Sequence, residues 1–511
     1  MNEKNASSNS MMKQTLLLTI VSTITLAVSF GKETVIAYFF GTSNIADAYT
    51  IAAEFPITLF SVISVAISTV LIPMYLKIHE SEGKINADRY ISNLISIVFL
   101  GGLCLLLFFE VFSSLLLRIL APGMKEETMQ LTNILFRLLL PITMLTIIVN
   151  IHTGVSNSNK SYLLPALTPN LLNIPIIIAG FLLTNKLGIF SIIIGTFIGI
   201  CLELIYSFCL AKKYYNFSPR INLGDKYMIS SLYLALPTLI GTCAEEVNKI
   251  IDRIFSSLLP TGAISSLNYG AKLSSGINSI IIVSISVVAY SEFSIAAAKK
   301  DMKLLSKTFE SSIRISILLL VPIIVGGILL SKEIITVVFA RGAFDEKDVL
   351  FISPIFTAYL VGLFFSAIRV TCCKFCYSIE NTKLPTITTI LSVIMNIPLN
   401  AILSIRYGAI GLAWATTISI AISTCFLFII IHTRFITFQR ESNICFLAKV
   451  MFGTLSMVLV LFGIKSIIYD SVPVLIYLIL QFVIGASVFV TFLFMTKVEE
   501  IRAILKCFKS K

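Results

Sequence analysis

The most constraining feature of this chain is a series of apolar runs, joined by short polar connections. A helix needs about 20 apolar residues to cross the hydrocarbon core of a bilayer. Roughly fourteen segments meet this requirement, beginning near residues 15, 46, 90, 128, 161, 187, 228, 263, 311, 349, 384, 408, 444 and 472. Only 13% of the residues are charged, whereas a soluble globular protein has about 25%. The sequence therefore predicts an all-α polytopic membrane protein.

Lysine and arginine are distributed unequally between the two sets of connections. If the N-terminus is cytoplasmic, the cytoplasmic segments hold 25 of the 39 basic residues and the opposite loops hold 8. Such an excess marks the cytoplasmic side of a bacterial membrane protein. We therefore expect both termini in the cytoplasm. Contact with membrane lipid headgroups accounts for the net charge of +12, and no basic patch with interleaved aromatics indicates nucleic acid.

The sequence also repeats itself after about 220 residues. "LAPGMKEE" (120–127) is echoed by "FARGAFDE" (339–346), and "LGIFSIIIG" (187–195) by "YGAIGLAWA" (407–415). Each repeat holds six apolar runs, and an even number returns the chain to the same side of the membrane. This pattern predicts two parallel six-helix lobes with a cavity between them, which is a transporter architecture. The predicted lobes span residues 1–225 and 226–440, and residues 441–511 add two transmembrane helices and a basic cytoplasmic tail.

Charged residues interrupt the first apolar region, "SFGKETVIAYFFGTSNIADAY" (29–49), at Lys32, Glu33 and Asp47. A charge at the centre of a membrane helix costs about 2.5–3.5 kcal/mol on insertion scales, so we expect this stretch to line a polar cavity. Lys272 occupies a loosely corresponding place in the second repeat. Two such lysines facing each other predict an anionic substrate group, most commonly a phosphate.

The run "TLIGTCAEEVNKIIDRIF" (238–255) carries five charges that fall within a stripe about 120° wide on a helix. One interpretation is the lining of a wet cavity, and the other is a self-neutralised structural network, since acids and bases alternate at helical spacing. The two interpretations are compatible. The residues of the stripe are Glu245, Glu246, Lys249, Asp252 and Arg253.

Single acids occur in three other apolar runs, at Glu54, Glu110 and Glu203. Such residues are more often buried hydrogen-bonding groups than substrate ligands. Glu54 is grouped with the predicted charge network of residues 245–253.

Asn396 and Asn400 are four residues apart and share one helix face. With Asp252 and Thr416 they would supply oxygen ligands to a hard monovalent cation. Interhelical hydrogen bonding by the same amides is the favoured alternative.

Catalytic and metal-binding motifs are absent from the sequence. The cysteine cluster "CCKFC" (Cys372, Cys373, Cys376) has no histidine or second cysteine pair nearby, and no phosphate-binding loop or nucleophile and base pair is present. We therefore expect a transporter without a metal or other cofactor, and not an enzyme.

Several motifs together resemble the MurJ/MviN family of lipid II flippases, within the multidrug/oligosaccharidyl-lipid/polysaccharide exporter superfamily. They are "GKETVIAYFFGTSNIADAY", "GVSNSNKSYLLPALTPNLLNI", "FSPRINL", "VFARGAFDEKDV" and "YSIENTKLPTITTI". Fourteen helices, with two after a twelve-helix core, are also similar to this family. The resemblance implies a flippase in the bacterial cytoplasmic membrane. It would move undecaprenyl-diphosphate-linked peptidoglycan precursor from the inner to the outer leaflet, alongside the cell-wall synthesis machinery.

The resemblance also implies roles for particular residues. Lys32 and Lys272 fall where the family usually has arginines that contact the diphosphate, and Asp47 matches an acid at the start of the second helix. Two other family arginine positions read as apolar here, near Leu26 and at Phe60, so the cavity is less cationic than the family pattern.

The resemblance further implies that the last two helices form a groove for the polyprenyl tail. Some family members have a sodium site, whose positions match Asp252, Asn396 and Thr416, with Asn400 in place of its second acid. The missing acid implies a weakened or absent sodium site, which leaves coupling to sodium and coupling to the membrane potential as alternatives.

Other functions compatible with the sequence are export of a different lipid-linked oligosaccharide, of the capsule or O-antigen type, and a drug/cation antiporter. A drug/cation antiporter leaves the last two helices unexplained. A membrane enzyme would need a large catalytic loop outside the membrane, and the outer loops are short. A scaffold without transport activity is the remaining alternative.

Overall fold

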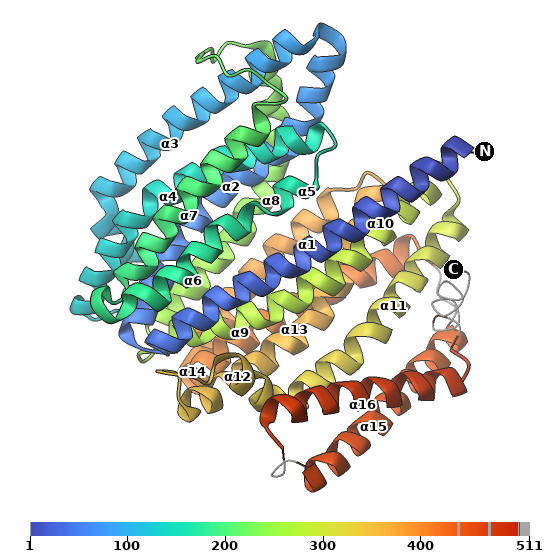
Figure 1. Cartoon of the computed structure of the whole chain (residues 1–511). Helices are drawn as coiled ribbons and strands as arrows, with labels where there is room; N and C mark the ends of the chain where they lie inside the picture. The colour runs from blue at the N-terminus through green and yellow to red at the C-terminus, as the bar shows by residue number, and fades with distance from the viewer. Residues whose placement is uncertain (1, 437–439, 469–471, 499, 501–511) are drawn as a thin grey trace. The chain divides into compact units, whose positions relative to one another are not determined.

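The computed structural model describes residues 2–436, 440–468, 472–498 and 500. Every regular element in these ranges is helical, as Figure 1 shows. A helix satisfies its own backbone hydrogen-bonding groups, which is what hydrocarbon demands of a spanning segment. The prediction of an all-α polytopic fold is confirmed.

The chain folds into two compact units, Met1–Ser265 and Ser266–Lys511. The first unit contains α1 (Asn2–Phe40), α2 (Asn44–Glu82), α3 (Lys84–Leu120), α4 (Glu126–Ser158), α5 (Leu163–Ala166), α6 (Thr168–Leu187), α7 (Phe190–Ala211) and α8 (Lys226–Ser257). Helix α9 (Ala263–Ile277) begins in the first unit and continues into the second. The second unit then contains the π-helical turn η1 (Asn278–Ile282), α10 (Val283–Ala298), α11 (Met302–Leu329), α12 (Ser331–Phe339), α13 (Glu346–Ser378), α14 (Lys383–Arg434), α15 (Arg440–Ile468) and α16 (Val474–Met495).

Within the described residues, 12 helices are long and apolar enough to cross a membrane. One of them, α14, is broken at Gly408, where φ is 58° and ψ is −135°. It therefore corresponds to two of the predicted segments placed end to end. Helix α8 matches a further predicted segment but is not among the 12. The fourteen predicted segments therefore correspond to these 12 helices, with α14 counted as two, and to α8.

Several helices begin directly after a polar residue whose side chain caps the first turn. A side-chain oxygen just before the helix accepts a hydrogen bond from a backbone N–H of the first turn, which has no partner within the helix. The residues that do this are Ser43 for α2, Asp225 for α8, Asp301 for α11 and Asp345 for α13.

The backbone repeats its irregular conformations at the interval of the sequence repeat. Lys160, after α4, and Glu380, after α13, have φ of 61° and 59°. Gly188 and Gly408 have φ of 56° and 58°, with ψ of −136° and −135°. Both pairs are 220 residues apart, and positive φ is rare enough that chance agreement is improbable. This supports a common fold for the two repeats.

The repeat and the compact units divide the chain differently. Helix α8 packs against α2 and α3, so it belongs to the first unit. The predicted lobe boundary near residue 226 describes the sequence repeat and not the packing, and it stays a prediction.

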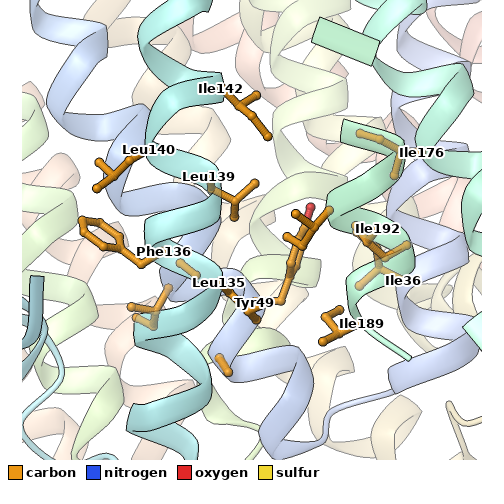
Figure 2. Close-up of a cluster of buried hydrophobic side chains, with 14 of the residues drawn as sticks. Ile36, Tyr49, Leu135, Phe136, Leu139, Leu140, Ile142, Ile176, Ile189 and Ile192 are labelled. Carbon is orange, nitrogen blue, oxygen red and sulfur yellow. The ribbon is translucent and has the colours of Figure 1, made fainter. Parts of the chain in front are cut away.

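One core of the first unit lies between α1, α2, α4, α6 and α7. Figure 2 shows Leu135, Leu139 and Ile142 along α4, with Tyr49 between them and Ile36. These side chains are almost completely buried. Between membrane helices such packing supplies dispersion contacts, since lipid tails are as apolar as leucine.

Two clusters of buried apolar side chains lie in the described part of the second unit. In one, Phe293, Phe309 and Phe375 pack with ring centroids 5.2–6.1 Å apart and join α10, α11 and α13. In the other, Leu318 of α11 packs with apolar residues of α15 and α16. Helices α15 and α16 therefore form a pair held to one side of this unit.

The connection between α7 and α8 is held along α3 by its backbone. Four polar side chains of α3 accept hydrogen bonds from alternate N–H groups of residues 216–222. The pairs are Asn216 to Asp88 (3.1 Å), Ser218 to Ser92 (3.1 Å), Arg220 to Ser96 (3.4 Å) and Asn222 to Asn93 (2.7 Å).

Candidate functional site

Lys32 lies on α1 in the first unit and pairs with the adjacent Glu33. Its Nζ is 3.2 Å from Glu33 Oε1, and the two side chains are 21% and 8% exposed. Glu33 therefore screens the lysine in a poorly hydrated environment, where an ion pair is stronger than at a surface. The exposed fraction of Lys32 leaves the ammonium able to contact an anion. Its role in substrate binding stays a prediction.

Asp47, in the first turn of α2, is buried, with 4% of its surface exposed. One carboxylate oxygen accepts a hydrogen bond from the Gly262 N–H at 2.7 Å, and the other from the Ser265 N–H at 2.8 Å. These N–H groups belong to the start of α9, where a negative charge is favoured. Gly262 has φ of 87°, and an added Cβ would lie 2.6 Å from the Thr42 carbonyl oxygen. Asp47 thus fixes the point at which the chain leaves the first unit.

Lys272 is a half-buried residue of α9 in the second unit. Tyr269 of the same helix packs against Phe339 and Phe344, at 5.1 and 5.8 Å between ring centroids. Lys272 is thus carried on a firmly packed helix. Lys32 and Lys272 belong to different units, and their approach to each other stays a prediction.

The charge stripe of α8 forms ion pairs of two kinds. Lys249 Nζ is 2.8 Å from Glu246 Oε1, one turn away on the same helix. Arg253 pairs instead with Glu54 of α2, and both side chains are half-buried. Asp252 is half-buried and Glu245 is exposed. The stripe therefore contains a structural network that extends to a neighbouring helix, and its role as a cavity lining stays a prediction.

The residues predicted for a monovalent cation lie in both units. Asn396 and Asn400 are fully buried on α14, and the Asn400 amide donates to Asn396 Oδ1 at 2.7 Å. The Thr416 hydroxyl donates to the Leu412 carbonyl oxygen at 3.1 Å. Asp252 belongs to the first unit. The cation site stays a prediction.

Two charged groups of the second unit were not anticipated as structural centres. Arg314 of α11 is 14% exposed and contacts Glu310, Glu500 and Asn443 at 2.9, 3.3 and 2.8 Å, so it ties α11 to the start of α15 and to the segment after α16. Glu310 and Arg314 are four residues apart on one helix, and this spacing could have predicted their ion pair from the sequence.

The second centre is the ion pair between Lys465 of α15 and Glu333 of α12, at 3.1 Å. Glu333 is 3% exposed. This contact joins two helices that are far apart in sequence, so no local residue spacing predicts it.

The comparisons with known proteins agree on one family. A family model described as lipid II flippase MurJ matches residues 36–483. The chain is 29% identical to the lipid II flippase MurJ of Thermosipho africanus, over 83% of this chain and 86% of the relative. It is 27% identical to a probable lipid II flippase MurJ of Thermotoga maritima, over 97% and 99% of the two chains.

Solved structures agree. One described as lipid II flippase MurJ in an inward closed conformation has a TM-score of 0.80 at 28% identity, covering 93% of this chain and 98% of that one. An inward-facing multidrug resistance MATE family transporter of the MOP superfamily shares the fold, with a TM-score of 0.69 at 12% identity over 82% and 98% of the chains.

Proposed function

Because the chain belongs to the MurJ family of lipid II flippases, we propose that it moves lipid II from the inner to the outer leaflet of the bacterial cytoplasmic membrane. It is a multi-pass membrane transporter of peptidoglycan synthesis. The observation that carries the proposal is the family match over residues 36–483.

The embedded lysines support a diphosphate cargo. An ammonium group in a poorly hydrated cavity is stabilised by a negatively charged oxygen, and phosphate supplies several. In the proposed cycle the diphosphate head enters near Lys32 and Lys272 while the lipid tail stays in the bilayer. Rocking of the two lobes then opens the cavity to the outer side. A membrane potential that is negative inside favours outward movement of the anion by about 2.3 kcal/mol per charge per 100 mV.

The proposed orientation places both termini in the cytoplasm. The support is the excess of basic residues on that side, 25 against 8. The long connection between α7 and α8 then lies in the cytoplasm, and the break at Gly408 lies on the outer side.

The test is growth of a strain depleted of its own lipid II flippase. We expect the unaltered chain to restore growth, and Lys32→Ala and Lys272→Ala each to abolish it at normal protein level. Lys303→Ala, at an exposed residue of the first turn of α11, is the matched control and should leave growth intact. Normal growth with both lysines replaced would contradict the diphosphate contact.

Purified protein in vesicles tests the cargo directly. We expect protein-dependent translocation of lipid II, lost in both lysine variants. If undecaprenyl diphosphate with a different glycan moves and lipid II does not, the chain exports another lipid-linked oligosaccharide. If neither moves, the flippase proposal fails.

A further inference from the structure

Glu203 is a buried acid that the proposed flipping cycle does not use. It lies on α7, which packs against α4 and α6, and it is 5% exposed. Its Oε2 atom is buried and accepts no hydrogen bond from any described residue. Within the same ranges, its carboxyl group also takes part in none of the ion pairs.

An ionised carboxylate in this position would be strongly destabilised. Burying a charge without a partner costs far more than burying a neutral polar group, and the usual outcome is that the group binds or releases a proton. A carboxyl group becomes neutral by binding one. The neutral acid then carries an O–H that needs a single acceptor.

A row of polar groups continues from Glu203 toward the end of α7. Ser207 lies one turn further along the helix, and its Oγ is 3.2 Å from Nδ1 of His152 on α4. The His152 ring lies 6.2 Å from the ring of Tyr215, measured between centroids. Tyr215 follows α7, and the carboxylate of Asp88 on α3 is close enough to act on it electrostatically.

Three atoms along this row are buried without a hydrogen-bond partner among the described residues. They are Glu203 Oε2, the Tyr215 hydroxyl oxygen and Asp88 Oδ1. Buried polar atoms nearly always have a partner, and ordered water supplies it where protein does not. Burial raises the pKa of Tyr215, and the Asp88 charge raises it further, so the phenol stays protonated and able to donate. The clustering indicates polar groups bridged by water.

We propose that Glu203 is a proton-binding site of the first unit, reached from the predicted cytoplasmic side through Asp88, Tyr215 and His152. Rows of acidic and histidine side chains carry protons in membrane pumps and transporters. All of these groups lie in the first unit, so the site does not depend on how the two units are arranged. Nor does it depend on which lipid the chain carries.

Few titratable side chains lie on the helices that pack around this row. Helix α4 contributes His152, α3 contributes Asp88, and α2 contributes Tyr75, which also lies within electrostatic reach of Asp88. Helix α6 contributes no titratable side chain between Thr168 and Asn185. No described lysine or arginine pairs with Glu203, so no neighbouring cation opposes its protonation.

Infrared difference spectroscopy of the full-length protein in phospholipid vesicles at neutral pH tests the site. We expect the unaltered chain to show the C=O stretching band of a protonated carboxyl group, and Glu203→Gln to lose it. Glu333→Gln is the control, because Glu333 is equally buried but pairs with Lys465. This control should keep the band. If Glu203→Gln does not fold, Glu203→Asp should shift the band without removing it. A band of equal size and position in every variant would overturn the proposal.

Deuterium exchange of the same band tests the path. Tyr215→Phe removes the buried hydroxyl and keeps the ring, so the Glu203 proton should exchange several-fold more slowly. Tyr214→Phe changes the adjacent, half-buried tyrosine and should leave the exchange rate unchanged. If the two variants exchange at the same rate as the unaltered chain, protons do not use the Tyr215 route and that part of the proposal is wrong.

Discussion

Replacing Asp47 with asparagine tests the clamp at the start of α9. The carboxylate accepts hydrogen bonds from the N–H groups of Gly262 and Ser265, in a site with 4% exposure. Asparagine can accept one of them and turns its own NH₂ toward the other. The change removes a hydrogen bond to a charged group, worth about 1.5–3 kcal/mol, and leaves a buried N–H unsatisfied, at about 1–3 kcal/mol. Since these contributions overlap, we expect a loss of roughly 3 kcal/mol.

The assay is thermal unfolding of the purified protein, followed by the fraction that remains monodisperse after heating. About 2–4 °C per kcal/mol is typical for a unit of this size, so the midpoint should fall by roughly 6–12 °C. Asp345→Asn is the control, because Asp345 caps α13 from an exposed position and should cost at most about 1 kcal/mol. Equal midpoints for the two variants would refute the argument that Asp47 is a buried double acceptor.

Two further predictions use the same thermal assay. Glu54→Gln and Arg253→Gln should show a coupling of about 1–2 kcal/mol in a double-mutant cycle, because each change leaves a half-buried charge without its partner. Additive effects of the two changes would contradict the ion pair. Gly188→Ala and Gly408→Ala should each cost about 1–3 kcal/mol, because φ is positive at both sites. The space around both is open, as it is at Gly463 in α15, where alanine should stabilise by up to about 1 kcal/mol. An equal effect at all three glycines would rule out backbone strain.

The sequence predicted the features that depend on local periodicity. The lengths of the apolar runs set the helices, and separate segments were predicted to begin near residues 384 and 408, which agrees with the break of α14 at Gly408. The ion pair between Glu246 and Lys249 is likewise predicted by their spacing of three residues on one helix. Each of these can be read from a window of a few turns.

Contacts between helices could not be predicted in this way. Glu54 was grouped with the charge network of residues 245–253, but no spacing in the sequence indicates that it pairs with Arg253, 199 residues away. Asp47 was assigned a role from its position, but its partners are backbone N–H groups, which carry no signature in the sequence. The rotation and depth of each helix decide such contacts, and packing against neighbours sets both.

The way in which α3 holds the connection between α7 and α8 has a consequence for how freely that segment can vary. Its hydrogen bonds come from the backbone N–H groups at the even positions from 216 to 222, so most side chains there are interchangeable. Proline is the exception, since it lacks the N–H. Pro219 occupies an odd position, where no N–H is used. Natural variation in this segment should therefore be wide but should admit proline only at alternate residues, while Asp88, Ser92 and Asn93 on the opposing helix stay constrained.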